Sequence, residues 1–263
     1  MSRLRRAVWN GFQSPGRQLF GPRFALDYTR VAASAALRWG DTGPGTLDFL
    51  GYRIVHANRS HAVYLLHEIF VNAAYRFDTD EPSPLILDCG ANIGMATLFF
   101  KSLHAGARIL AFEPEPTTFT YLARNVQENA LADTRVEQAA VGARAGVGRL
   151  FVAEGDAGSI TASATPSDGA REVPTAVVRL AARIDEPVAF LKLDIEGGEW
   201  EVIDDLADSG ALRLVRQAVI ECHEPGGGPR TEALLGRLRD AGFEAAETPA
   251  AGGRAVMVAA VRR

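Results

Sequence analysis

The segment LILDCGANIGMATLFF, residues 85–100, decides the fold. LILDC is apolar apart from Asp88 and predicts a short buried strand, and residues 96–103 follow as a helix. Between them lie Gly90, Asn92 and Gly94, and glycine suits a turn that must bend sharply and let a ligand approach closely. A strand, a glycine turn and a helix in succession predict the first unit of an α/β fold.

The same alternation continues toward the C-terminus. Strands are predicted over residues 108–114, 136–141, 189–196 and 214–223, and helices start at Pro116, Glu199 and Thr231. Two final strands, residues 243–247 and 255–261, would form an antiparallel pair. We therefore expect a Rossmann-like α/β fold with a mostly parallel sheet, helices on both faces and a C-terminal antiparallel pair.

The chain divides into two expected parts. Residues 81–263 form the α/β domain, and EPSP at residues 81–84 separates it from an N-terminal helical or lid segment, residues 1–80. Apolar residues at helical spacing predict a helix reaching Phe77. Strands around a small polar stretch predict an inserted hairpin or loop near residues 149–178.

Two acids define the expected ligand. Glu113 ends the second strand, where a carboxylate can accept hydrogen bonds from both hydroxyls of a ribose. A dinucleotide fingerprint would need G-x-G-x-x-G, which the turn from Gly90 to Gly94 lacks. Asp88 would repel a pyrophosphate but suits the ammonium and sulfonium groups of S-adenosylmethionine. The pattern favours that methyl donor over NAD.

Three segments together resemble the core of FkbM-family methyltransferases. They are LILDCGANIGMATLFF (85–100), AFEPEPTTFTYLARNVQEN (111–129) and FLKLDIEGGEWEVI (190–203). The resemblance covers residues 85–224, and EIFVNAAYRF (68–77) is similar to a stretch that often precedes this core. It implies a class I methyltransferase fold, S-adenosylmethionine as donor and often a hydroxyl acceptor on a sugar, polyketide or other secondary metabolite.

The resemblance also implies a donor site. The turn residues Asp88, Gly90, Ala91, Asn92 and Gly94 would hold the methionine portion of the donor. Glu113 would hold the ribose while Pro114 shapes the turn, and Ala140 and Val141 would lie at the adenine edge. From the helical pattern alone, Glu68 and Tyr75 share one stripe and could line a lid over the donor.

A second group of polar residues follows the fourth and fifth predicted strands. Alternation places Asp194 and Glu196 on one side of their strand, and Glu221 and His223 on one side of theirs. If the strands are neighbours, the four side chains converge. Asp194 is the preferred residue for orienting the acceptor or taking its proton, with His223 as the competing base. Glu199 is interpreted as favouring the positive end of its helix.

The same four side chains could instead bind a divalent cation that acidifies a hydroxyl group, although their spacing does not require one, so no metal is expected. Further alternatives are an N-methyltransferase acting on an amino or amide group, and a module that binds the donor without turnover. The formal net charge of −4 disfavours nucleic acid as a partner. Without an apolar run of about 20 residues, we expect no membrane contact. We also expect a cytoplasmic protein with a small-molecule acceptor, and homo-oligomers stay an open possibility.

Overall fold

The computed structural model describes residues 14–37, 43–153, 170–223, 228–249 and 255–262. Residues 154–169, the middle of the predicted insertion, and Glu224, the end of the predicted family core, lie outside this part of the chain.

The central sheet has seven strands in the order β11-β12-β10-β9-β3-β4-β5. Neighbours from β10 to β5 are parallel, whereas β12 is antiparallel to both β10 and β11. This confirms the predicted mostly parallel sheet with a C-terminal antiparallel pair. The strands are β3 (Leu85–Cys89), β4 (Arg108–Phe112), β5 (Thr134–Glu137), β9 (Val188–Leu193), β10 (Val215–Cys222), β11 (Phe243–Pro249) and β12 (Val256–Arg262).

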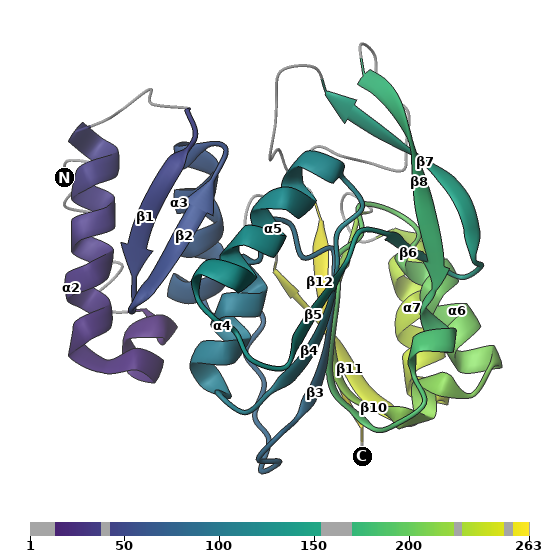
Figure 1. Ribbon diagram of the computed structural model, residues 1–263. Coiled ribbons are helices and arrows are strands. Elements are labelled where there is room, and N and C mark those ends of the chain that lie inside the picture. The colour runs from purple at the N-terminus through teal and green to yellow at the C-terminus, as the bar shows by residue number, and fades with distance from the viewer. Residues whose placement is uncertain (1–13, 38–42, 154–169, 224–227, 250–254, 263) are drawn as a thin grey trace.

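Helices cover both faces of this sheet, as predicted (Figure 1). On one face lie α4 (Met95–Leu103) and α5 (Pro116–Glu128), and on the other lie α6 (Glu199–Asp208) and α7 (Pro229–Asp240). Each pair covers its own hydrophobic cluster, with Phe99 and Leu122 in one and Ile203 and Leu235 in the other. Every residue of β9 is buried, which is typical of a central parallel strand.

The predicted strand over residues 136–141 is wrong in one respect, because two strands occupy this region. β5 ends at Glu137 and pairs with β4. The amide of Ala139 then donates to the carbonyl of Glu137, and the chain turns into β6 (Ala140–Gly142). β6 joins a separate three-stranded sheet with β7 (Gly146–Ala153) and β8 (Ala170–Arg179), of which β7 and β8 are antiparallel.

The N-terminal segment contains more than helix. It comprises α2 (Pro15–Leu37), the hairpin β1 (Gly45–Phe49) and β2 (Tyr52–His56), α3 (Arg59–Leu66) and the π-helix η1 (His67–Val71). The hairpin is not predicted from the sequence. Figure 1 shows these elements beside α4 and α5, on one side of the central sheet.

Asn125 of α5 joins the hairpin to the rest of the fold. Its amide nitrogen donates to the carbonyls of Val55 (3.0 Å) and Ile93 (2.7 Å), and its oxygen accepts from the amide of Val55 (2.6 Å). One buried side chain therefore ties β2 to the turn that follows β3.

The predicted helix reaching Phe77 is wrong at its C-terminal end. Helical structure stops at Val71, where the amide of Asn72 donates to His67 in the wider π-helical pattern. Ala73 then takes a left-handed conformation, φ 54°, which ends the helix. Phe77 still reaches the core, because its ring stacks on that of Phe190 at a centroid distance of 4.4 Å.

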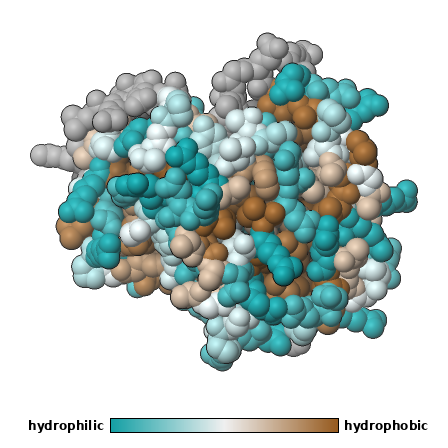
Figure 2. All heavy atoms as spheres, viewed as in Figure 1, coloured by the Kyte–Doolittle hydropathy of each residue, from teal (hydrophilic) through white to brown (hydrophobic). Residues whose placement is uncertain are grey.

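Figure 2 shows hydrophilic residues over much of the visible face, with hydrophobic residues gathered among them in the middle of the view. In the described part of the chain, every helix is too short or too polar to cross a membrane.

Candidate active site

The glycine turn after β3 brings the backbone close to the loop after β9. Gly90, Asn92 and Gly94 have φ values of 80°, 51° and 88°, so all three are left-handed. A Cβ added at Gly90 would lie 1.7 Å from the carbonyl oxygen of Asp194. The amides of Gly90 and Ala91 donate to the carbonyl of Phe112 at 3.0 and 2.8 Å. Glycine is therefore required at position 90, where β3, β4 and β9 converge.

Asp88 lies in β3, just before this turn. Its side chain is fully buried, and its Oδ2 accepts from the hydroxyl of Thr97 at 2.6 Å. Nζ of Lys192 lies 3.6 Å from its Oδ1. Burial raises the pKa of Asp88, whereas the charge of Lys192 and the hydrogen bond from Thr97 act in the opposite direction. A direct contact between Asp88 and the methyl donor stays a prediction.

Glu113 lies at the end of β4 and connects it to the glycine turn. One carboxylate oxygen accepts from the amide of Asn92 and the other from the amide of Glu115, both at 2.9 Å. The residue is 6% exposed, and burial raises the pKa of its carboxyl group to about 7, despite both hydrogen bonds. Pro114, which follows, is half-buried. The turn and Glu113 therefore form one hydrogen-bonded unit.

Ala140 and Val141 belong to β6, and not to the strand that was expected to present them. Ala140 is half-buried and Val141 is buried. Their proposed place at the adenine edge stays a prediction.

Tyr75 and Glu68 do not share one helical stripe, which corrects the sequence analysis. Glu68 belongs to the π-helix η1, whereas Tyr75 follows the helix and is 4% exposed. The hydroxyl of Tyr75 lies 3.3 Å from Oδ2 of Asp194 and 3.4 Å from Oε2 of Glu221. Burial raises the pKa of the Glu68 carboxyl group, and the charge of Asp194 raises it further. Tyr75 is therefore in contact with the carboxylates of the site.

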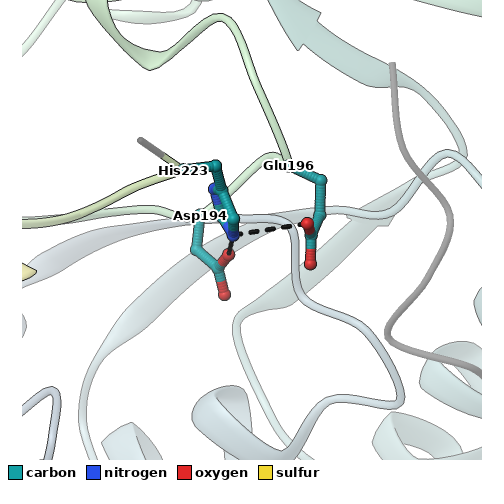
Figure 3. Close-up of side chains that lie close together, drawn as sticks. All are labelled: Asp194, Glu196 and His223. Atoms are coloured by element: carbon teal, nitrogen blue, oxygen red, sulfur yellow. Dashed lines mark ion pairs between the residues drawn. The ribbon is translucent and has the colours of Figure 1, made fainter. Parts of the chain in front are cut away.

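Asp194, Glu196 and His223 converge after the ends of the neighbouring strands β9 and β10 (Figure 3). Nε2 of His223 lies 3.3 Å from Oε2 of Glu196 and 3.9 Å from Oδ1 of Asp194. Glu196 has a φ of 59°, an uncommon conformation for a residue other than glycine. Glu221 joins them through Tyr75. The structure thus brings the four predicted side chains together at one edge of the sheet.

Glu199 has a larger part in this cluster than the sequence analysis gave it. It is fully buried at the start of α6, and its Oε1 accepts from the amides of Ile195 (3.3 Å) and Gly197 (3.0 Å). The same oxygen lies 2.9 Å from Nδ1 of His223. Glu199 therefore fixes the orientation of the imidazole. A helix-end acid in the sequence carries no signal of this contact.

Lys192 is the second residue that the sequence analysis missed. Its side chain is 3% exposed, and its Nζ donates to the carbonyl of Gly90 at 2.6 Å and lies 3.2 Å from Oδ2 of Asp194. Burial lowers its pKa, but the charges of Asp194 and Asp88 outweigh burial and raise the pKa overall. Lys192 therefore links the glycine turn to the cluster. The available signal was a lysine inside the otherwise apolar strand FLKL.

Burial and neighbouring charges shift the pKa values of the cluster. Burial raises the pKa values of Glu196 and Glu221 to about 7 each, and the charge of Asp194 adds to both shifts. Burial lowers the pKa of His223, but the hydrogen bond to Glu199 and the nearby carboxylate charges outweigh it and raise the pKa to about 9. Strongly perturbed acids and a base in one place are typical of functional sites.

A solved structure has the same fold. The crystal structure of a methyltransferase FkbM from Methylobacillus flagellatus KT superposes with a TM-score of 0.51 and 15% sequence identity. The match covers 98% of this chain and 59% of that one. The chain has the class I methyltransferase fold that the sequence analysis predicted.

Sequence comparisons identify the family. The model of the methyltransferase FkbM domain matches residues 88–245. The 31-O-demethyl-FK506 methyltransferase FkbM of Streptomyces tacrolimicus is 32% identical, covering 81% of this chain and 94% of that relative. The methyltransferase sdnD of Sordaria araneosa is 30% identical, covering 75% of this chain and 87% of that relative. The chain belongs to the FkbM methyltransferase family, as predicted, and the family implies S-adenosylmethionine as methyl donor.

Proposed function

We propose that this methyltransferase moves the methyl group of S-adenosylmethionine to a hydroxyl group of a small molecule. The observation that carries the proposal is the approach of the glycine turn to Asp194, where a Cβ at Gly90 would lie 1.7 Å from the Asp194 carbonyl oxygen. The turn expected to hold the donor and the carboxylates expected to meet the acceptor are therefore adjacent.

The residues at the turn fit the donor. The Gly90 turn leaves no room for a side chain, and Glu113 presents a buried carboxylate beside it. We expect Glu113 to accept hydrogen bonds from the ribose hydroxyls, with Gly90, Ala91, Asn92 and Gly94 around the methionine portion. S-adenosylmethionine supplies a methyl group whose carbon bonds to the acceptor oxygen as the carbon–sulfur bond breaks, leaving the electron pair on sulfur and a proton to be removed.

The carboxylates after β9 and β10 would serve the acceptor. Alignment of the acceptor oxygen with the methyl carbon is the main requirement, and we assign it to Asp194. The hydroxyl proton would pass to one of the carboxylates that Tyr75 bridges, Asp194 or Glu221. His223 is the weaker choice of base, because Nδ1 lies against Glu199 and Nε2 faces two carboxylates.

The name of the 31-O-demethyl-FK506 methyltransferase supports an oxygen acceptor. Transfer to an amino or amide nitrogen is the second candidate, since the same carboxylates could take a proton from nitrogen. A module that binds the donor without turnover is the third.

The test is titration of the protein with S-adenosylhomocysteine by calorimetry, alongside NADH, with Glu113→Ala as the variant. We expect micromolar binding of S-adenosylhomocysteine alone, and its loss in the variant. Transfer of a labelled methyl group to matched alcohols and amines then identifies the acceptor atom. Preference for NADH, or no binding of S-adenosylhomocysteine, contradicts the proposal.

A further inference from the structure

The three side chains in Figure 3 lie close enough together to be ligands of one ion. One atom from each of Asp194, Glu196 and His223 lies within 4.8 Å of the others. In an octahedral site with bonds of about 2.1 Å, adjacent ligand atoms are about 3.0 Å apart and opposite atoms about 4.2 Å. The distances from Nε2 of His223, 3.3 and 3.9 Å, fall within this range.

The imidazole is oriented as metal-binding histidines usually are. Such a histidine donates its second ring N–H to a carboxylate or carbonyl, which fixes the tautomer and directs the free nitrogen at the metal. Nδ1 of His223 lies 2.9 Å from Oε1 of Glu199, and Nε2 faces Asp194 and Glu196. The backbone amides of Ile195 and Gly197 hold the same Glu199 oxygen in place.

Two further observations, the charge balance and a buried carboxylate oxygen, favour a cation at this place. Asp194, Glu196 and Glu199 all lie within ion-pair distance of His223, and Lys192 neutralises Asp194 from the opposite side. Glu199 is fully buried, yet its Oε2 has no hydrogen-bond partner among the described residues. With Asp194 paired to Lys192, one imidazole is left to balance both Glu196 and Glu199, whereas a divalent ion at Nε2 would add two positive charges between Asp194 and Glu196.

The chemistry of the ligands narrows the kind of ion. One imidazole nitrogen and two carboxylate oxygens suit Mn²⁺ and related first-row ions better than Mg²⁺, which prefers oxygen alone. The side chains of His223, Asp194 and Glu196 are 21%, 22% and 37% exposed, so the site is reachable from solvent. Three protein ligands would leave positions for water or an acceptor oxygen.

We propose that Asp194 Oδ1, Glu196 Oε2 and His223 Nε2 bind one divalent first-row cation such as Mn²⁺, which orients the acceptor hydroxyl toward the methyl donor. This inference rests on the proposed function and deepens it, since the ion gives the acceptor oxygen a fixed place beside the Gly90 turn. Glu199 is a positioning residue, because it acts on the ion through His223.

The test measures Mn²⁺ alone, by the loss of the electron paramagnetic resonance signal of free Mn²⁺ as chelator-treated full-length protein is added. We expect one ion per chain, with binding weakened at least tenfold in Glu196→Gln and in His223→Ala. Nitrogen coupling in the pulsed spectrum should be present in the wild type and absent in His223→Ala. Glu199→Gln should weaken binding about 10–100-fold while the nitrogen coupling remains.

Glu186→Gln is the matched control, because Glu186 is a similarly exposed glutamate that pairs with Arg108 outside the cluster. It should bind Mn²⁺ as the wild type does. No Mn²⁺ binding by the wild type, or binding unchanged in both Glu196→Gln and His223→Ala, overturns the cation site. The S-adenosylhomocysteine titration is independent of this readout, so loss of the proposed function and loss of the cation site are separate outcomes.

Discussion

The carbonyl oxygen of Asp194 lies 1.7 Å from the position that a Cβ at residue 90 would take. Gly90→Ala therefore combines a backbone clash with a left-handed conformation that alone costs about 1–2 kcal/mol. We expect loss of S-adenosylhomocysteine binding and a lower melting temperature. Calorimetry and thermal unfolding measure both.

Gly236→Ala is the control for this prediction, because nothing lies within 4 Å of a Cβ at Gly236 in α7. It should keep donor binding and gain about 0.5–1 kcal/mol of stability. Donor affinity that survives in Gly90→Ala would show that the turn is not where the donor binds.

Donor binding should depend on pH through Glu113. Burial raises the pKa of this carboxyl group to about 7, and the ionised form accepts hydrogen bonds from a ribose better than the protonated form. Affinity for S-adenosylhomocysteine should rise with pH, level off above about 7, and fall by up to about tenfold per unit below it. Because the folded-state pKa is raised, ionising Glu113 opposes folding, and its contribution to stability declines as the pH rises from 4.5 toward 7.

Glu113→Gln should flatten this dependence in calorimetric titrations across that pH range. Glu128→Gln, which removes a carboxylate at the opposite end of α5, should retain it. The same pH profile in wild type and Glu113→Gln would assign the titration to another group.

Lys192→Met should lower both stability and donor affinity. It removes the cation that pairs with Asp88 and Asp194 in a buried environment, and breaking such a pair typically costs about 3–5 kcal/mol. Denaturant unfolding gives the first effect and calorimetry on the folded protein gives the second.

Lys101→Met is a matched control, since Lys101 is also buried and donates to the carbonyls of Ala107 and Ala132 outside the site. It should lower stability while the folded protein keeps its donor affinity. Equal loss of affinity in both variants would reduce Lys192 to a general structural role.

Tyr75→Phe should separate the acceptor side from the donor side. The variant keeps the buried ring but loses the hydroxyl between Asp194 and Glu221, and a hydrogen bond to a charged group contributes about 1.5–3 kcal/mol. We expect kcat to fall roughly 10–100-fold. Donor affinity should change little in calorimetric titrations, with Tyr121→Phe on α5 as the control. A large loss of donor affinity would return Tyr75 to the donor site, as the sequence analysis expected.

Local pattern was sufficient to predict the central sheet. The segments of β3, β4, β9 and β10 are short, mostly apolar runs, each followed by a helix. The failures lie where tertiary contacts override local pattern. The apolar spacing up to Phe77 is helical, but the left-handed Ala73 ends the helix and Phe77 is buried from a loop. Residues 136–141 were predicted as one strand, although they divide between two sheets.

The same contrast between local pattern and tertiary contacts holds for the candidate site. Asp194, Glu196, Glu221 and His223 could be placed together, because they lie at the ends of adjacent parallel strands. The alternation assumed for Asp194 and Glu196 is wrong, since β9 ends at Leu193 and Glu196 is left-handed. Lys192 and Glu199 could not be placed, because their contacts depend on burial. A charged residue in a sequence does not reveal whether it faces water or two carboxylates inside the protein.

The hydrogen bonds of Asn125 bear on where the chain can be cut. The expected domain begins at residue 81, but the partners of Asn125 are Val55 in the hairpin and Ile93 in the glycine turn after β3. Deleting the first 80 residues would strip a buried amide of two of its three bonds and leave it beside Ile93. The hairpin thus helps to hold the glycine turn in place, and we expect a protein that begins at residue 81 to lose donor binding while its central sheet still forms.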